Sequence, residues 1–146
     1  MRKFCLFISI LLLSAIIVCA NTACKKTKEA YIKQGVAKVK LKKYNQAIED
    51  FSQAIKLDPN NAEYYYKRGV TYGNINQHER AIEDFNEAIR LNPKYAEAYS
   101  NRGFVYMVKL DDKKKACSDW KRACELGDCI NLNLAIKKGV CKGSER

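Results

Sequence analysis

The chain repeats itself every 34 residues, and this period restricts its fold more than any other feature. Gly35, Gly69 and Gly103 keep the interval, and so do Pro59 and Pro93. The other positions in this register are Tyr31/Tyr65/Tyr99, Ala47/Ala81, Phe51/Phe85 and Ala54/Ala88. A period of this length is typical of stacked helical units that bury a core only between neighbours. It therefore indicates a solenoid, and it directs the question of function toward a binding partner and away from a reaction.

Within each unit, apolar residues recur at helical spacing in two segments separated by a short polar loop. In the second unit we expect helices over residues 62–74 and 79–91. Pro93 ends the second of these helices, because the residue before a proline is pushed out of the α region. Gly69 allows the two helices to approach closely, and aromatic residues fill the space between neighbouring hairpins. A single unit cannot bury these aromatics, so about three stacked units are needed for stability.

The second unit resembles a tetratricopeptide (TPR) repeat at every signature position except Arg68, which stands where leucine is usual. The matching residues are Tyr65, Gly69, Tyr72, Ala81, Phe85, Ala88 and Pro93. The first unit departs from the pattern at Lys38, where tyrosine is usual. The third unit slips by one residue in the loop 110–115 and then resumes with Ala116, Trp120 and Ala123.

This resemblance implies an all-α fold, a right-handed α-solenoid of three TPR helix hairpins followed by a C-terminal capping helix. The hairpins are expected over residues 28–61, 62–95 and 96–128, the capping helix over 129–141 and a frayed tail over 142–146. Terminal units of a repeat array need a cap with a more polar outer face. The apolar residues available to cover the open end of the stack are Ile130, Leu132, Leu134 and Ile136.

Resemblance to TPR domains also implies that the first helix of each unit lines a concave groove. The residues predicted to line it and to contact a partner are Ile32, Val36, Tyr66, Val70, Asn74, Ser100, Phe104 and Met107. The stack does not require apolar residues at these positions, yet most of them are apolar. An apolar strip in a concave surface can bind a helix or an extended peptide. The alternative is that the tail or the capping helix covers part of the groove.

Some TPR domains hold a C-terminal carboxylate in a clamp of lysine and asparagine residues. The residues at the corresponding positions here are Ile32, Val36, Lys67, Glu97 and Asn101, which departs from that pattern. We therefore do not expect this chain to bind the C-termini of chaperones.

Four cysteines lie in the last quarter of the chain. A zinc site is disfavoured, because no Cys-x2-Cys pair is present and the one histidine, His78, lies far away in sequence. If the last helix of the third unit and the tail form a hairpin about Gly127-Asp128, two nested disulfides are predicted, Cys124–Cys129 and Cys117–Cys141. The alternatives are buried thiols, since cysteine packs like a small apolar residue, and a metal site.

No catalytic set emerges from the sequence. His78 falls in a loop or a first helical turn, where a solvated role is expected, and pairs such as Glu49-Asp50 and Glu83-Asp84 are expected on repeat surfaces. We therefore expect no enzymatic activity, no cofactor and no small-molecule substrate. The formal charge of +11 is unevenly spread, and the basic stretch over residues 25–43 suits anionic lipids or an acidic partner, the alternative being a solvated helix face and linker. No nucleic-acid-binding motif accompanies it, so a nucleic-acid partner is not expected.

Residues 1–23 are predicted to be a signal peptide and not part of the fold. Two basic residues precede an apolar run over residues 4–20, and small residues at its end favour a cut after Ala20. A rival cut before Cys24 resembles the bacterial lipoprotein signal, in which the new N-terminal cysteine is lipidated, although Asn21 stands where leucine is usual. An uncleaved signal anchor is the third alternative, because the run is just long enough to span a bilayer.

The chain is therefore expected to be exported, as a periplasmic or outer-membrane-associated lipoprotein, with secreted and membrane-anchored forms as alternatives. Lipidation of Cys24 leaves four cysteines, an even number that suits disulfides in an exported protein. The predicted function is an envelope-associated scaffold or adaptor that binds a protein or peptide partner in the groove. The alternatives are a chaperone-like assembly factor for a membrane or secretion complex, and a redox or metal protein that uses the C-terminal cysteines.

Overall fold

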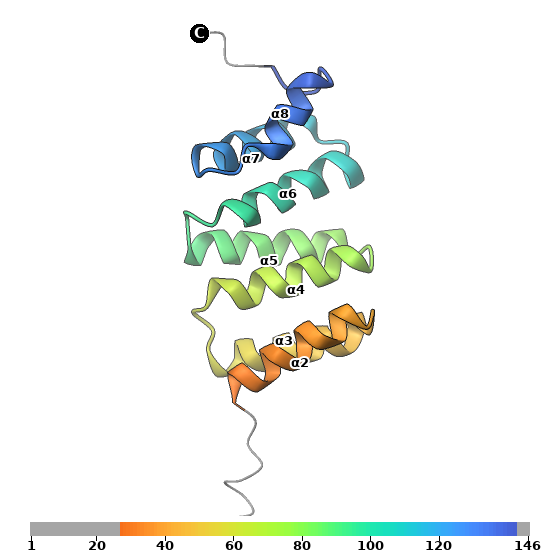
Figure 1. Cartoon of the computed structure of the whole chain (residues 1–146), viewed down its shortest axis with the longest axis vertical. Helices are drawn as coiled ribbons and strands as arrows, with labels where there is room; N and C mark the ends of the chain where they lie inside the picture. Colours follow the sequence, from red (N-terminus) through yellow and green to blue (C-terminus); the bar gives the residue numbers. More distant parts are fainter. Residues whose placement is uncertain (1–26, 143–146) are drawn as a thin grey trace, which may run out of the picture.

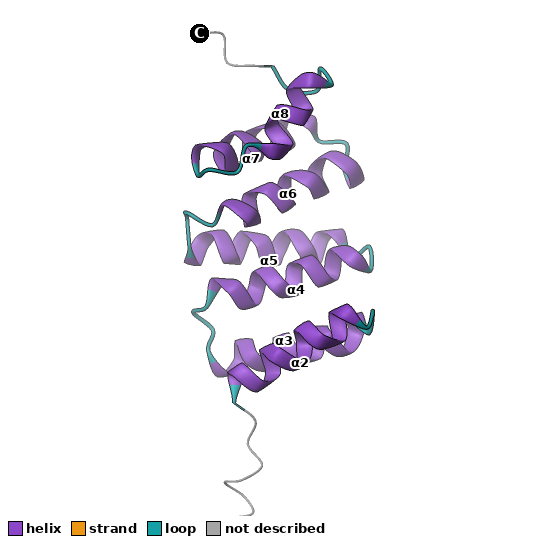
Figure 2. Cartoon of the chain, in the orientation of Figure 1, coloured by secondary structure: helices purple, strands orange, loops and turns teal. Residues whose placement is uncertain are grey.

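The computed structural model describes residues 27–142, and every regular element in that range is an α-helix (Figures 1 and 2). The predicted signal peptide, the lipidation site Cys24 and most of the predicted tail lie outside the described residues. The helices are α2 (Lys28–Lys40), α3 (Tyr44–Leu57), α4 (Ala62–Asn74), α5 (His78–Leu91), α6 (Ala96–Lys109), α7 (Lys113–Glu125) and α8 (Ile130–Lys137).

The helices pair in chain order into three antiparallel hairpins that stack along one axis, with α8 at the end (Figure 1). The two helices of the second unit lie within one residue of the helices expected from the sequence. This arrangement confirms the all-α fold built from TPR-like hairpins. No helix in the described range is both long enough and apolar enough to cross a membrane.

Each hairpin turns through three residues, and the middle residue adopts a left-handed backbone conformation. These residues are Lys42 (φ 56°), Asn76 (φ 59°) and Asp111 (φ 48°). Lys42 and Asn76 are 34 residues apart, whereas Asp111 follows Asn76 after 35 residues. The extra residue belongs to α6, which is one residue longer than α2 and α4. The slip predicted for the loop 110–115 therefore lies in the last turn of α6, where the amide of Asp112 donates to the carbonyl of Tyr106. The loop itself keeps the length of its two counterparts.

A glycine on the first helix of each hairpin packs against an aromatic ring on the second helix. A Cβ atom at Gly35 would lie 2.5 Å from Cε1 of Phe51, a separation that real Cβ atoms essentially never show. Gly69 faces Phe85 in the same way, at 3.0 Å, and the corresponding contact in the third hairpin is between Gly103 and Trp120. The alanines that flank these rings on α3, α5 and α7 are fully buried or nearly so: Ala47, Ala54, Ala81, Ala88, Ala116 and Ala123.

Arg68 joins three helices through its guanidinium group. Its Nε and Nη2 atoms donate to the two carboxylate oxygens of Asp84 on α5, at 2.9 and 2.8 Å. Its Nη1 atom donates to Oγ of Ser52 on α3, in the preceding hairpin, at 3.0 Å. Arg68, which departs from the TPR pattern, therefore links the two helices of its own hairpin and also links this hairpin to the preceding one.

The third hairpin repeats this arrangement. Arg102 donates to both carboxylate oxygens of Asp119 on α7 and to Oδ1 of Asn86 on α5. In the first hairpin, the Lys38 ammonium lies 2.6 Å from a carboxylate oxygen of Asp50. The three hairpins thus share a buried aspartate with a cationic partner.

The expectation that Glu49-Asp50 and Glu83-Asp84 lie on repeat surfaces is therefore wrong for the aspartates. Asp50 and Asp84 are buried, whereas Glu49 and Glu83 are exposed. Burial raises the pKa of the Asp84 carboxyl group, although the bond from Arg68 acts in the opposite direction. Adjacent residues on a helix point about 100° apart, so one member of each pair faces the partner helix.

The C-terminal cap contains both disulfides in the predicted pairing, Cys117–Cys141 and Cys124–Cys129. The helix α8 spans only Ile130–Lys137, which is shorter than the predicted 129–141. The cap packs on Trp120 through Ala135 and Cys141, with Leu132 and Val140 beside them.

Of the four apolar residues of the tail that were available to cover the open end, one packs against the core. Ile130, Leu134 and Ile136 are exposed, at 77%, 49% and 36%, and of the predicted set only Leu132 packs against the core. Alternate residues share a face on a strand but not on a helix, so the four side chains cannot all point into the stack.

Substitution of two glycines should change stability in opposite directions. Gly35→Ala should lower the free energy of unfolding by about 1–3 kcal/mol, because the new methyl group overlaps the buried ring of Phe51. Gly73→Ala should raise it by about 0.5–1 kcal/mol, because nothing lies within 4 Å of its Cβ position and alanine favours a helix. Chemical denaturation measures both. Equal effects would contradict the proposed glycine–aromatic contact.

Removal of one buried carboxylate should be far more costly than removal of its exposed neighbour. Asp84→Ala leaves the half-buried guanidinium of Arg68 without its anionic partner, and we expect a loss of about 1–3 kcal/mol. Glu83→Ala is the matched control and should stay within about 0.5 kcal/mol of the wild type. Urea denaturation compares them, and a similar loss in both variants would show that the pair with Arg68 is not what stabilises the hairpin.

Candidate functional site

Three hollows follow one another along the layer formed by α2, α4, α6 and α8. The first lies between α2 and α4, the second between α4 and α6, and the third between α6 and α8, with volumes of about 220, 180 and 250 Å³. Val70 lines both the first and the second hollow, and Phe104 lines both the second and the third. The hollows therefore adjoin one another in a row along the stack, and we refer to this row as the groove.

The first hollow is apolar apart from its rim. It is lined by Val36, Val39, Phe51, Tyr66, Lys67, Val70 and Thr71. The Lys67 ammonium lies 3.0 Å from a carboxylate oxygen of Glu63, one turn earlier on α4. Its charge is therefore already partly compensated within the chain.

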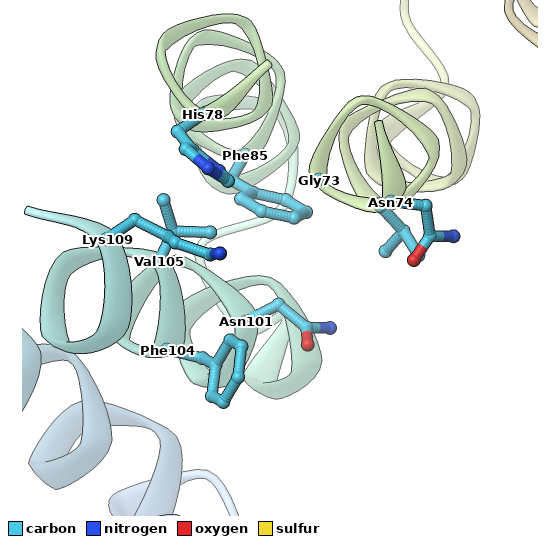
Figure 3. Close-up of a pocket in the computed structure, with 9 residues that line it drawn as sticks. Gly73, Asn74, His78, Phe85, Asn101, Phe104, Val105 and Lys109 are labelled. Carbon is cyan, nitrogen blue, oxygen red and sulfur yellow. The ribbon is translucent and has the colours of Figure 1, made fainter. Parts of the chain in front are cut away.

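The second hollow combines apolar and amide side chains (Figure 3). Figure 3 shows Asn74 of α4 and Asn101 of α6 pointing into the open space between their helices, with His78 and Phe85 contributed by α5. The remaining lining residues are Val70, Gly73, Phe104, Val105 and Lys109.

The third hollow has the most accessible apolar side chains. Phe104 and Val108 lie one helical turn apart on α6 and are 50% and 52% exposed, and Leu134 of α8 is 49% exposed. The other lining residues are Met107, Trp120, Asn131, Ala135, Lys138 and Val140. A cluster of half-exposed apolar side chains around a hollow is the usual character of a protein- or peptide-binding surface.

Sequence comparison agrees with this architecture. A sequence model of the TPR repeat matches residues 35–76 and 74–109, which together make up half of the chain. The chain belongs to the TPR repeat family. This is a scaffold family and is generally non-catalytic. No curated protein matches the chain at the level of sequence.

Solved TPR structures show the same fold. The first TPR domain of Spaghetti (RPAP3), solved with the HSP90 peptide SRMEEVD, is 26% identical with a TM-score of 0.72, and the match covers 77% of this chain and 89% of that one. The TPR domain of Arabidopsis OM64 is 28% identical, with a TM-score of 0.72 and coverage of 77% and 93%. MamA is 28% identical, with a TM-score of 0.72 and coverage of 82% and 72%.

Five of the predicted TPR groove residues line the hollows, namely Val36, Val70, Asn74, Phe104 and Met107. Two of them also pack against the core, Val70 beside Phe85 and Val105, and Met107 beside Trp120 and Ala135. Ile32 lines none of the three hollows and packs instead against the core around Ala54, Ile55 and Tyr64. That these residues contact a partner stays a prediction.

Tyr66 lines the first hollow and also supports the fold. Its ring centroid lies 4.9 Å from that of Tyr95 and 6.1 Å from that of Phe85, and its hydroxyl group accepts a hydrogen bond of 2.8 Å from Nδ2 of Asn101. Burial raises the pKa of the Tyr66 hydroxyl, and the carboxylate of Glu97 acts in the same direction. The hydroxyl therefore stays neutral and serves as a fixed hydrogen-bonding group.

Ser100 does not line the groove as predicted, because α8 covers it. The residue is buried, its hydroxyl oxygen accepts a hydrogen bond of 2.8 Å from Nδ2 of Asn131, and its carbonyl oxygen accepts one from Nε1 of Trp120. The alternative considered from the sequence, in which the capping helix covers part of the groove, is therefore the arrangement found at this position.

Some residues of the site were not predicted from the sequence. Lys109 and Lys138 border the second and third hollows, and Leu134 belongs to the third although it was expected to cover the end of the stack. His78, expected to be solvated, is the first residue of α5 and is half-buried, with its Nδ1 atom buried and unpaired among the described residues. The helical spacing of α8 could have placed Leu134 on an open face. Nothing in the sequence around Lys109 or Lys138, by contrast, marks these two lysines as part of a site.

The C-terminal cysteines offer no metal site in this arrangement. Each sulfur atom of the four is engaged in a disulfide. Within residues 27–142, no three side chains among histidine, cysteine, aspartate and glutamate come together in a way that could hold a metal ion.

Proposed function

We propose that this TPR chain is a protein–protein interaction module whose groove binds a helix or an extended peptide of a partner protein. The observation that carries the proposal is the row of three connected hollows with half-exposed Phe104 at the junction of the second and third. The isolated chain gains nothing by leaving such a side chain exposed at a concave surface, whereas a partner could bury it. The RPAP3 domain, similar in fold, was solved with a peptide bound.

We further propose that the chain acts as a scaffold or adaptor in the cell envelope, tethered through a lipid on Cys24. The support is the sequence of the leader and the pair of disulfides, which persist in oxidising compartments. A partner that copurifies in stoichiometric amounts and survives high salt would fit a scaffold. Only transient contact with a client would favour the chaperone-like assembly factor.

Truncation of the exposed groove residues should abolish partner binding without unfolding the chain. We choose Phe104→Ala/Val108→Ala over any variant of Tyr66, because both side chains are half-exposed whereas Tyr66 packs between Tyr95 and Phe85. Affinity purification from the native cells, with quantitative mass spectrometry, should show the loss of a partner by at least about tenfold.

The matched control is Leu57→Ala on α3, since Leu57 is also about half-exposed and lines none of the three hollows. This control should retain the partner. Circular dichroism should show the same helix content in all three proteins. A partner retained equally by the double variant and the wild type would refute binding in the groove.

Processing of the leader can be checked by intact-mass analysis of the protein purified from its native membranes. We expect a chain that begins at Cys24 and carries additional mass from lipid, and we expect Cys24→Ser to lack that mass. A chain that begins at Asn21, or one that retains the leader without acyl groups, would overturn the lipoprotein proposal. Either result would leave the proposal for the groove standing.

A further inference from the structure

The C-terminal half of the groove carries positive charge that the chain does not compensate. Lys109 borders the second hollow and Lys138 borders the third. Neither ammonium group forms an ion pair with any described carboxylate, whereas Lys67 at the first hollow is paired with Glu63. Within residues 27–142, the Lys109 Nζ atom donates a long hydrogen bond of 3.5 Å to Oδ1 of Asn76.

Among the residues that line the three hollows there is no aspartate and no glutamate. The carboxylates closest to Lys109 in sequence belong to the α6–α7 loop, and Asp112 is engaged there. It accepts a hydrogen bond from the amide of Lys115 and forms an ion pair with the ammonium group of the same residue at 3.1 Å. Asp111, the other loop carboxylate, is exposed and lines none of the hollows.

The last turn of α6 is basic, whereas the first turns of α2, α4 and α6 each hold a glutamate. These glutamates are Glu29, Glu63 and Glu97. Lys109 is the basic residue in the last turn of α6, and the last turn of α4 holds none. The end of α6 that borders the second hollow therefore carries positive charge.

Among the residues that line the three hollows, the most exposed apolar side chains lie at the same end as the uncompensated lysines. Phe104, Val108 and Leu134 are each about half exposed, whereas Val36, Tyr66 and Val70 of the first hollow are partly buried by the stack. A ligand that matches this end must therefore combine apolar side chains with negative charge. Asn74 and Asn101 supply amide groups at the second hollow that can bond the backbone of such a ligand.

We propose that the C-terminal half of the groove binds an apolar segment that carries carboxylates. Its apolar side chains fill the second and third hollows on either side of Phe104, and its carboxylates lie against Lys109 and Lys138. The carboxylates can be those of aspartate or glutamate side chains or of a C-terminus. An ion pair formed beside an apolar surface is partly shielded from water, which strengthens it relative to a fully exposed pair. This inference rests on the proposed binding function of the groove.

The first test is a selection from a displayed library of random peptides of about 15 residues on the purified full-length chain. Peptides that also bind Phe104→Ala are discarded. We expect the remaining peptides to combine aromatic or aliphatic residues with aspartate, glutamate or a free C-terminal carboxylate. Peptides that depend on Phe104 but show no enrichment of carboxylates would overturn this inference and leave the proposed function standing. Failure to obtain any peptide that depends on Phe104 would count against both.

The second test measures the affinity of the most enriched peptide by fluorescence anisotropy. Lys109→Gln/Lys138→Gln should weaken binding by about tenfold, and added salt should reduce this difference. Lys113→Gln/Lys114→Gln is the control with the same change of net charge, since these exposed lysines of α7 line none of the three hollows. It should change the affinity by less than about twofold.

Two altered peptides identify which carboxylate is bound. In one, every aspartate and glutamate is replaced by its amide, and in the other only the C-terminus is amidated. Loss of affinity with either peptide, together with loss of sensitivity to Lys109→Gln/Lys138→Gln, supports the proposal and names the source. Unchanged affinity with both peptides, or equal effects of the groove and control lysine pairs, would overturn it.

Discussion

The contact between a glycine and an aromatic ring sets the spacing within every hairpin, and the rest of the stack depends on that spacing. Gly35, Gly69 and Gly103 leave room for Phe51, Phe85 and Trp120 at positions where a methyl group would overlap the ring or nearly touch it. With the helices this close, the guanidinium groups of Arg68 and Arg102 can reach an aspartate in their own hairpin and a polar side chain in the previous one. A wider hairpin would move the aspartate away from the arginine, and the guanidinium group would lose the partner that holds it in place.

Much of the fold could be predicted from the sequence because its units repeat. The polar contacts between helices and the packing of the C-terminal cap could not. A 34-residue period fixes which residues face a neighbour, so the helices of the second unit were placed within a residue. The two disulfides followed from antiparallel geometry. By contrast, Arg68 was noticed only as a departure from the TPR pattern, and its partner Asp84 was expected on the surface. Pairing of side chains across two helices depends on their rotation and distance, which one sequence does not specify.

The end of the stack shows how closure changes the binding surface. The helix α8 is only eight residues long, and a helix of this length is marginal in isolation. Its attachment relies on the disulfide between Cys117 and Cys141 and on the bond from Asn131 to Ser100. By covering Ser100, α8 removes one groove position, and by presenting Leu134 it adds another. The groove predicted from the repeats alone is therefore shifted toward Phe104, Val108 and the cap.

Burial of charge explains why the lysines of the groove differ from the cations within the stack. The carboxylate of Asp84 loses its hydration when the chain folds; this burial raises its pKa, and the bond from Arg68 acts in the opposite direction. This pair joins α4 to α5 within one hairpin, and the same guanidinium group bonds Ser52 of the preceding hairpin. Lys109 and Lys138 instead remain hydrated in the free chain, so the fold bears no such cost for them. Their dehydration would occur only when a partner covers the groove, and a partner without a carboxylate could not compensate for it. The same penalty that makes the Arg68–Asp84 pair specific would therefore make the groove selective.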